Sequence, residues 1–257
     1  MLTRRHGAIL KLLEARGALA VGVLSQELGV STETVRRDIR ALVESGAAVR
    51  VHGAVGLAGQ IGEAPFERRM RENAAAKRAI ARAMAERIAD GDSLMLDTGT
   101  TTSFLARELL GHRRITVVTN SLDIARTLAT VNGNRVFMAG GALRGDSGAA
   151  LGASALEFIR GFTVQYAIIS AGAVDAGGVM DFDLQEAEFA RAVLACGERR
   201  VVITDASKFG RRGFIRVAGF AGLDDLVTDQ PPPPAIATAM AAAGMAVTLA
   251  APGNHGQ

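Results

Sequence analysis

The sequence predicts an α/β protein that consists of an N-terminal winged helix-turn-helix and a larger, mostly parallel α/β domain. Residues 1 to about 55 hold short amphipathic helices rich in arginine. From about residue 75 the pattern changes to short apolar segments that alternate with helical stretches. This second pattern is typical of a parallel sheet that is covered by helices on both faces.

We expect four segments: the winged helix-turn-helix over residues 1–57, a linker over 58–74, the larger α/β domain over 75–250 and a flexible tail over 251–257. The stretch Gly53–Gly62 carries four regularly spaced glycines, which is typical of a connector that allows movement.

The composition excludes several classes of protein. Of the 257 residues, 49% are hydrophobic, which favours a packed core over disorder. The single cysteine, Cys196, excludes an intramolecular disulfide, and together with the lack of a signal peptide it indicates the cytoplasm. The four histidines are scattered, so we expect no metal and no cofactor. The uncharged stretch Ala235–Ala251 is broken by Gly244 and predicts a short helix, a turn and a final buried strand, not a membrane span.

The third of three short helices in the N-terminal region has a complete start signal. Ser31 is a strong N-cap, because its hydroxyl can accept from free backbone N–H groups of the first turn. Val30 and Val35 stand at the positions of a hydrophobic staple. Gly29 ends the preceding helix, and two helices joined in this way are typical of a helix-turn-helix, whose second helix reads DNA.

This third helix divides into an apolar and a basic face. Val35, Ile39 and Leu42 recur at helical spacing, which places arginines on the opposite side. Residues 48–53 follow as a β-hairpin wing, from which two further basic side chains point outward. A charged helix face alone is more often a solvated surface, but the turn, the cap and the wing together favour DNA binding. The expected DNA-binding residues are Ser31, Thr32, Thr34, Arg36, Arg37, Arg40, Arg50 and His52.

Seven apolar segments of the second region are predicted strands. They are Ser93–Leu96, Ile115–Thr119, Arg135–Ala139, Ala167–Ala171, Arg200–Thr204, Leu226–Thr228 and Val247–Leu249. The helices predicted between them include Ala76–Ala89, Ser103–Leu110, Leu122–Thr130 and Leu184–Cys196.

Polar residues cluster where several of these strands end, which is the edge of an open parallel sheet where ligands bind. Helix N-terminal N–H groups and hydroxyls there suit a phosphate, with Lys208 and Arg144 supplying charge. Asp97, Glu186 and Asp205 would accept from sugar or polyol hydroxyls, or would only cap helices. The expected effector-binding residues are Asp97, Thr98, Gly99, Thr100, Thr101, Thr102, Thr119, Asn120, Ser121, Gly140, Gly141, Arg144, Gly172, Glu186, Asp205 and Lys208.

Two nucleotide-binding signatures are absent from the sequence. The chain contains neither a Gly-x-Gly nor a Gly-Lys dipeptide, so it lacks both the dinucleotide and the P-loop fingerprints. We expect no catalytic residues. The alternative is a sugar-phosphate isomerase-like enzyme with an accessory DNA-binding head, in which Glu186, Asp205 and Lys208 would transfer protons.

The N-terminal motif resembles the signature of the DeoR family of bacterial regulators. The matching residues are Val30-Ser31-x-x-Thr34-Val35-Arg36-Arg37-Asp38-Ile39-x-x-Leu42, then Gly46 and Arg50-Val51-His52-Gly53. The family usually has a second glycine after His-Gly, where this chain has Ala54.

The resemblance continues from about Phe66 to Pro234. The matching residues include Lys77, Asp90-Gly91-Asp92, the polar residues at the strand ends given above, Gly152, Arg191-Ala192 and Asp205-x-Ser207-Lys208-Phe209-Gly210-Arg211. It implies a sensor fold like that of ribose-5-phosphate isomerase and the CoA-transferases. It also implies a homo-oligomeric repressor that a phosphorylated sugar or polyol releases from double-stranded operator DNA.

Within the family, one subgroup is the most similar to this chain. Met180-Asp181-Phe182-Asp183 and Thr228-Asp229-x-Pro231-Pro232-Pro233 are most similar to the subgroup that controls glycerol-3-phosphate regulons. That similarity makes glycerol-3-phosphate the expected effector. Gly172-Ala173-Val174-Asp175 and Gln165 depart from the commoner family pattern near the expected site.

Overall fold

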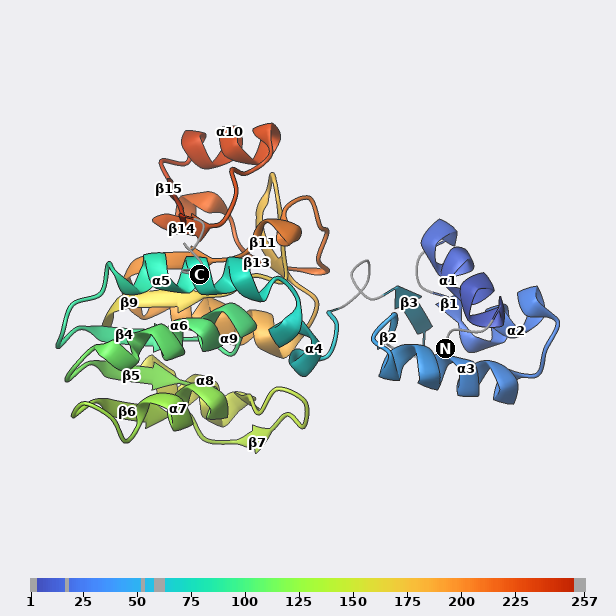
Figure 1. Ribbon diagram of the computed structural model, residues 1–257, viewed down its shortest axis with the longest axis horizontal. Coiled ribbons are helices and arrows are strands. Elements are labelled where there is room, and N and C mark those ends of the chain that lie inside the picture. The colour runs from blue at the N-terminus through green and yellow to red at the C-terminus, as the bar shows by residue number, and fades with distance from the viewer. Residues whose placement is uncertain (1–3, 17–18, 52–53, 58–62, 252–257) are drawn as a thin grey trace, which may run out of the picture. The chain divides into compact units, whose positions relative to one another are not determined.

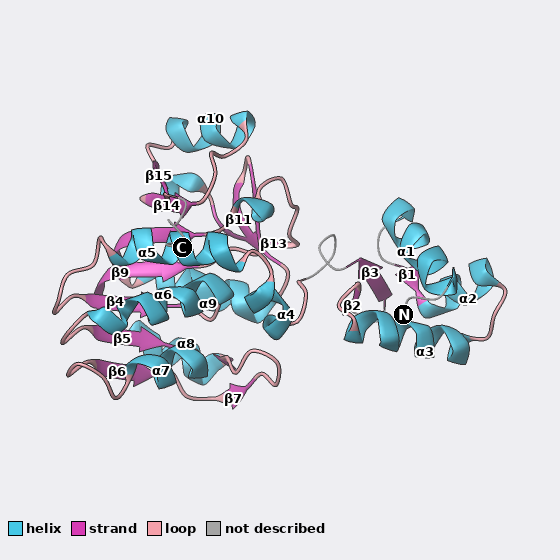
Figure 2. Ribbon diagram, viewed as in Figure 1, coloured by secondary structure: helices cyan, strands magenta, loops and turns pink. Residues whose placement is uncertain are grey.

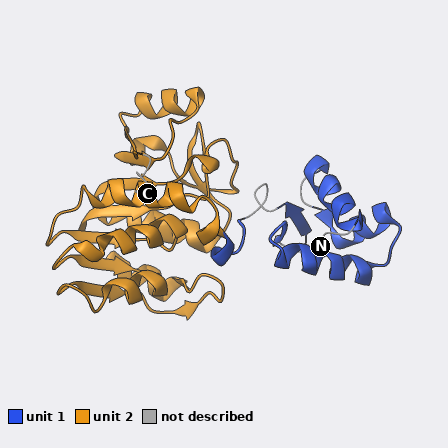
Figure 3. Cartoon of the chain, in the orientation of Figure 1, with its two compact units in different colours: residues 1–68 blue, residues 69–257 orange. Residues whose placement is uncertain are grey.

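The computed structural model of the chain describes residues 4–16, 19–51, 54–57 and 63–251. The chain forms two compact units, residues 1–68 and residues 69–257 (Figure 3). Each unit is described by itself below.

The first unit is a three-helix domain with a small antiparallel sheet (Figure 1). Leu24, Ile39 and Leu42 lie in its core, so the predicted apolar face of the third helix is buried. The predicted wing is the β2–β3 hairpin, but it is longer than predicted: residues 54–57, which we expected in the glycine-rich connector, form its second strand by pairing with β2. β1 pairs with β3 as a third strand that the sequence pattern did not predict. The elements are α1 (Arg4–Arg16), β1 (Leu19–Ala20), α2 (Val21–Leu28), α3 (Thr32–Glu44), β2 (Ala48–Val51) and β3 (Ala54–Leu57).

The second unit is built on a seven-stranded sheet in the order β15-β14-β12-β9-β4-β5-β6, in which all neighbours are parallel (Figure 2). All seven predicted strands lie in this sheet. β12 begins earlier than predicted, because it pairs with β9 from Gly197 onward and the polar residues Glu198 and Arg199 conceal its start. The strands are β4 (Ser93–Leu96), β5 (Thr116–Thr119), β6 (Arg135–Met138), β9 (Val164–Ile169), β12 (Gly197–Ile203), β14 (Asp225–Thr228) and β15 (Ala246–Leu249).

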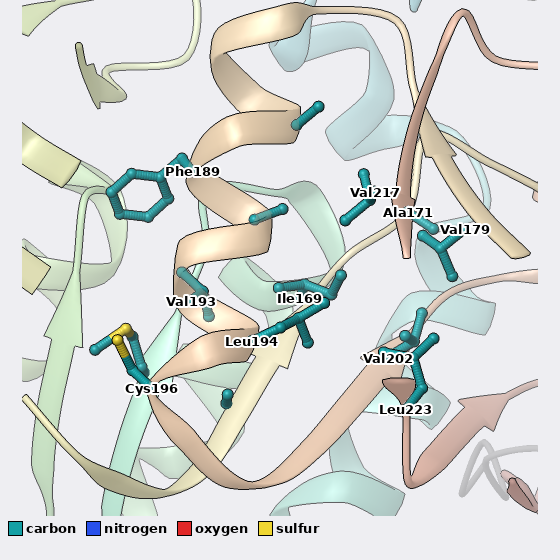
Figure 4. Close-up of a cluster of buried hydrophobic side chains, with 14 of the residues drawn as sticks. Ile169, Ala171, Val179, Phe189, Val193, Leu194, Cys196, Val202, Val217 and Leu223 are labelled. Atoms are coloured by element: carbon teal, nitrogen blue, oxygen red, sulfur yellow. The ribbon is translucent and has the colours of Figure 1, made fainter. Parts of the chain in front are cut away.

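Helices cover both faces of this sheet. Leu94 and Leu96 of β4 belong to a core with α5, α6 and α7, whereas Met95 between them belongs to the core on the opposite face. Figure 4 shows the second core, where Phe189, Val193 and Leu194 of one helix lie over the sheet. The helices are α4 (Phe66–Arg71), α5 (Ala74–Ala85), α6 (Thr100–Glu108), α7 (Leu122–Leu128), α8 (Ala153–Arg160), α9 (Leu184–Ala195) and α10 (Pro234–Ala242), with 3-10 turns at Leu109–Gly111, Ala206–Lys208 and Phe220–Gly222.

Two small antiparallel sheets and α8 were not predicted. β10 (Ala173–Asp175), β11 (Gly178–Asp181) and β13 (Ile215–Ala218) form one sheet, and β7 (Ala142–Leu143) and β8 (Ala150–Leu151) form the other. Their strands of two to four residues are too short to show a period in sequence. Gly178 is required in β11, because its φ is +131° and a Cβ there would lie 2.2 Å from the carbonyl oxygen of Ala218.

The uncharged segment near the C-terminus forms α10 and β15, as the sequence predicts. The expected burial of the strand is wrong, because β15 lies at the edge of the sheet and Val247 and Leu249 are exposed. Within the ranges that the structure describes, no helix combines the length and the apolar character that a membrane span requires.

Asp225 is a buried charge beside the core of the sensor unit, and it binds two arginines. Its Oδ1 lies 2.8 Å from a guanidinium nitrogen of Arg87 and 2.9 Å from one of Arg199. Burial alone would raise the pKa of Asp225, but the hydrogen bonds from Arg199 and Arg87 hold it below its usual range. This contribution to stability is therefore full above about pH 4, the ordinary pKa of aspartate, and is lost as the pH falls through the lowered pKa.

Asp225→Asn is expected to lower the free energy of unfolding of the sensor unit by about 3 kcal/mol at pH 7, because it leaves the arginines without their counter-charge. Denaturant unfolding can be followed by the fluorescence of Tyr166, the only tyrosine in a chain without tryptophan. The control is Asp224→Asn, whose partly exposed pair with Arg200 should be worth less than about 1 kcal/mol. Equal losses in the two variants would contradict the importance of Asp225.

Candidate functional site

The N-terminus of α3 is capped as the sequence predicts. Ser31 Oγ accepts from the backbone N–H of Thr34 at 3.2 Å and lies 2.9 Å from the Thr34 hydroxyl. Gly29 ends α2 with a φ of 63°, in the left-handed conformation that glycine adopts without steric cost. The turn between the two helices is thus fixed by local chemistry.

The basic face of α3 is open to solvent. Arg36, Arg37, Arg40 and Thr32 are all exposed, and Arg36 makes only a loose 3.5 Å contact with Glu33, one turn away. Arg50 on β2 is also exposed, whereas His52 lies outside the described residues. The helix therefore presents arginine side chains that are available to phosphates or base edges.

Asp38, on the buried side of α3, was not among the predicted functional residues. Its carboxylate binds Arg5 Nε, lies 3.0 Å from a second Arg5 nitrogen and lies 3.4 Å from His6 Nε2. The hydrogen bonds from Arg5 hold the pKa of Asp38 below its usual range. The sequence signal that could have identified Asp38 was an acidic residue on the apolar face of a helix, since a buried charge requires a partner. The contact positions α3 on α1.

The carboxyl ends of the parallel strands bring many of the predicted effector-binding residues to one edge of the sensor sheet. Thr98 Oγ1 donates to Asn120 Oδ1 at 2.9 Å, which joins the loops after β4 and β5. Ser170, directly beyond β9, donates through its backbone N–H to Asp97 Oδ2 at 3.0 Å. Ser121 caps α7 through Ile124 N, and Thr119 Oγ1 accepts from Ser121 N. Gly140 and Gly141 follow β6 and are exposed.

Asp97 is the most perturbed group at this edge. Burial raises its pKa to about 7, although the hydrogen bonds from Ser170 oppose the rise. Its Oδ1 is buried and makes no hydrogen bond within the described residues. The neighbouring Gly99 is required by this packing, because a Cβ there would lie 1.9 Å from Ser170 Oγ. The fold therefore holds a desolvated carboxyl with one free oxygen.

The threonine run after Asp97 starts α6. Thr100, Thr101 and Thr102 are buried, and Thr102 Oγ1 donates to the carbonyl oxygens of Asp97 and Gly99, each at 3.0 Å. The backbone N–H groups of this first turn have no acceptor inside the helix, which is the basis of anion binding at helix N-termini.

Arg144 and Glu186 bind each other in this structure. Arg144 donates to Glu186 Oε1 at 2.7 Å and to Asp183 Oδ1 at 3.1 Å. Asp183 also caps α9 by accepting from the backbone N–H groups of Gln185 and Glu186. These contacts join the loop between β7 and β8 to the start of α9. Both charges predicted to meet a ligand thus have a protein partner.

Asp205 and Lys208 lie in the loop after β12. Asp205 is 2% exposed, and its Oδ1 accepts from Ser207 N at 3.1 Å and from Asn73 Nδ2 at 3.0 Å. Its Oδ2 is buried and makes no hydrogen bond within the described residues. Lys208 is half-buried. Asn73 lies 132 positions away in sequence, so no local pattern could have assigned it to this loop.

Gly172 is buried after β9, where a Cβ would lie 3.2 Å from a ring carbon of Phe182. It supports the β10–β11 hairpin.

Two surface hollows of about 660 and 710 Å³ lie near the amino ends of the strands, and none of the predicted effector-binding residues lines them.

Each of the two units matches a known protein family. Residues 5–60 match the DeoR-like helix-turn-helix domain, and residues 72–230 match the DeoR C terminal sensor domain. The second match alone covers more than half of the chain. The chain belongs to the DeoR family.

Curated relatives of this DeoR-family chain are similar over most of their length. The chain is 33% identical to the glycerol-3-phosphate regulon repressor of Escherichia coli (strain K12) over 232 residues, which is 90% of this chain and 92% of the relative. It is 35% identical to the HTH-type transcriptional repressor CsqR of the same organism, over 90% of this chain and 89% of that one. The DeoR-family chain is therefore a transcription regulator, and the alternative of an isomerase with an accessory head is not favoured.

Solved structures show partial similarity to this DeoR-family chain. Ribose 5-phosphate isomerase A from Neisseria gonorrhoeae is 19% identical with a TM-score of 0.39, and 53% of each chain is covered. The δ subunit of eIF2B from Chaetomium thermophilum is 17% identical with a TM-score of 0.41, with 56% of this chain and 52% of that one covered. Similarity at this level says nothing about ligands.

The DeoR-family chain shows no cluster of metal ligands: nowhere in its described ranges do three His, Cys, Asp or Glu side chains gather at a distance that would hold an ion.

Asp97→Asn is expected to stabilise the sensor unit at pH 8 by up to about 4 kcal/mol, because the raised pKa makes ionisation of the folded carboxyl unfavourable. Between pH 4 and 7 the folded carboxyl keeps a proton that the unfolded chain releases, so wild-type stability falls as the pH rises. The gain should thus shrink toward zero at pH 4, as measured by denaturant unfolding at both pH values. A gain that is equal at pH 4 and pH 8, or a similar gain for the exposed Asp146→Asn control, would contradict this prediction.

Proposed function

We propose that this DeoR-family regulator is a repressor that binds operator DNA through α3 and the β2–β3 wing, and that a phosphorylated sugar or polyol releases it. Glycerol-3-phosphate is the first candidate effector. The observation that carries the proposal is that Asp97 and Asp205, both buried at the carboxyl edge of the parallel sheet, each keep one oxygen that has no hydrogen-bond partner among the described residues.

The two free carboxylate oxygens suit hydroxyl groups. A buried acceptor without a partner is unfavourable by about 1–3 kcal/mol, and a polyol hydroxyl that donates to it would remove this cost. The phosphate would lie at the N-terminus of α6, where the first-turn N–H groups and threonine hydroxyls act as donors, with Lys208 supplying charge. The relatives named as glycerol-3-phosphate regulon repressors support a small phosphorylated polyol.

The exposed arginines of α3 suit the DNA side of the proposal. They lie on a helix whose start is fixed by Ser31 and whose opposite face is held to α1 by Asp38. Operators are normally read by two or more heads, so we infer a homo-oligomer that places two copies of α3 on successive half-sites. Because its target is the chromosome, we also infer that the regulator works in the cytoplasm.

A thermal-shift panel of glycerol-3-phosphate, hexose phosphates and pentose phosphates is expected to identify one stabilising ligand. A ligand at one hundred times its Kd should add about 2.7 kcal/mol, while glycerol without phosphate should have little effect. Lys208→Ala and Thr100→Ala should weaken the response to the phosphorylated ligand. A full response in both variants would show that the phosphate is bound elsewhere, and turnover of ribose 5-phosphate at nanomolar protein would favour the enzyme.

Arg37→Ala and Arg40→Ala are expected to weaken binding to a duplex selected from a random library. An arginine that contacts phosphate should reduce the slope of log K against log salt by about one, whereas an arginine that reads a base should mainly reduce discrimination between sequences. Fluorescence anisotropy over a salt series measures both. The control is Arg16→Ala, which removes an exposed arginine paired with Glu27 outside α3. Unchanged binding in both α3 variants would refute the assignment of α3.

A further inference from the structure

The corner between α4 and α5 contains an asparagine in an unusual backbone conformation. α4 ends at Arg71, α5 begins at Ala74, and Asn73 between them has a φ of 53°. Residues other than glycine rarely adopt this left-handed region, and asparagine is among the few that tolerate it. The corner is therefore a place where the chain needs a further contact to stay in this conformation.

That contact comes from the proposed effector site. Asn73 Nδ2 donates to Asp205 Oδ1 at 3.0 Å, across 132 residues of sequence. The acceptor Asp205 is 2% exposed, whereas Asn73 itself is exposed, so the bond joins a surface corner to a buried carboxylate. Its second oxygen has no partner within the described residues. Oδ1 of Asp205 thus holds the corner, and we assign Oδ2 of the same carboxylate to an effector hydroxyl.

Lys77 holds the same corner from the other side. It lies one turn into α5, is 3% exposed, and its Nζ donates to the carbonyl oxygen of Arg69 and, at 2.8 Å, to that of Glu72. These carbonyls are at the end of α4, where a positive charge is favourable. Lys77 fixes the last turn of α4 to α5, so a change at Asn73 is passed to α4 and not absorbed by a flexible joint.

We propose that Asn73 relays effector occupancy from Asp205 to the α4–α5 corner, which in sequence comes just after the boundary between the two units at residues 68 and 69. This inference rests on the proposed function, because it takes Asp205 as an effector ligand. Oδ1 already accepts from the backbone N–H and the hydroxyl of Ser207. A hydroxyl that donates to Oδ2 adds a further contact that holds the carboxylate in the orientation in which Oδ1 binds Asn73. The effector then binds more tightly when the corner is held, which is the differential affinity that a conformational shift requires.

Hydrogen–deuterium exchange of the full chain tests this relay, with the most stabilising compound of the thermal-shift panel as the probe. In wild type the probe should slow exchange in the Asp205–Lys208 loop. It should also slow exchange at residues 69–77 by about fivefold or more, as expected for a coupling of 1 kcal/mol or above. In Asn73→Gly the left-handed backbone is retained without strain and only the amide is lost. The probe should then protect the Asp205–Lys208 loop but leave residues 69–77 unchanged.

The matched control is Asn132→Gly. Asn132 also has a left-handed φ, of 51°, and its amide donates to the carbonyls of Leu110 and His112, so this variant loses the same chemistry away from the corner. It should behave as wild type.

Two outcomes would overturn the relay while leaving the proposed function intact. One is protection of residues 69–77 in Asn73→Gly that equals the wild-type value. The other is protection of the Asp205–Lys208 loop in wild type without any change at residues 69–77. If no compound of the panel protects the Asp205–Lys208 loop of wild type, the proposed effector site and the relay fall together.

Discussion

The parallel alignment of the seven central strands is the constraint on which the sensor unit depends. Because every strand runs the same way, the residues that follow β4, β5, β9 and β12 arrive at one edge although they are distant in sequence. This edge is dense in polar groups, and the backbone must approach closely there: Gly99 leaves room for Ser170, whose N–H in turn binds Asp97. Burial then raises the pKa of Asp97 to about 7 and leaves one of its oxygens free. Such a cost to stability is typical of sites that are built for a ligand.

The DNA-binding domain depends on a different type of contact, a buried ion pair that holds α3 in place. Its core is small, and α3 must keep one face exposed for function. Asp38 compensates for this by binding Arg5 and His6 from within the apolar face, so that α3 is held by an ion pair as well as by Ile39 and Leu42. The arginines on the outer face are then free of structural duties and remain exposed. The two units thus use buried aspartates differently: a satisfied one positions a helix, and incompletely satisfied ones lie at the edge where we propose that the effector binds.

Much of this could be predicted from the sequence, because the signals were local. The cap at Ser31, the glycine turn at Gly29 and the apolar runs of the central strands each lie within a few residues, and all seven strands are found in the sheet. The contacts that were missed join distant segments: Asn73 with Asp205, Arg144 with Glu186, and Asp38 with Arg5. The short β10–β11–β13 sheet was missed because its register depends on tertiary pairing, including the approach of Ala218 to Gly178. The gathering of these residues at one edge of the sheet was thus predictable, whereas their hydrogen-bond partners were not.

The central claim is that occupancy of the edge formed by Asp97 and Asp205 changes the affinity of α3 for DNA. The most direct measurement is the Kd of wild-type protein for a selected operator duplex, by fluorescence anisotropy at fixed salt, with and without saturating glycerol-3-phosphate. We expect the Kd for DNA to rise by about 5- to 150-fold, the range of typical coupling free energies. An unchanged Kd, under conditions where calorimetry shows that glycerol-3-phosphate is bound, would contradict the claim.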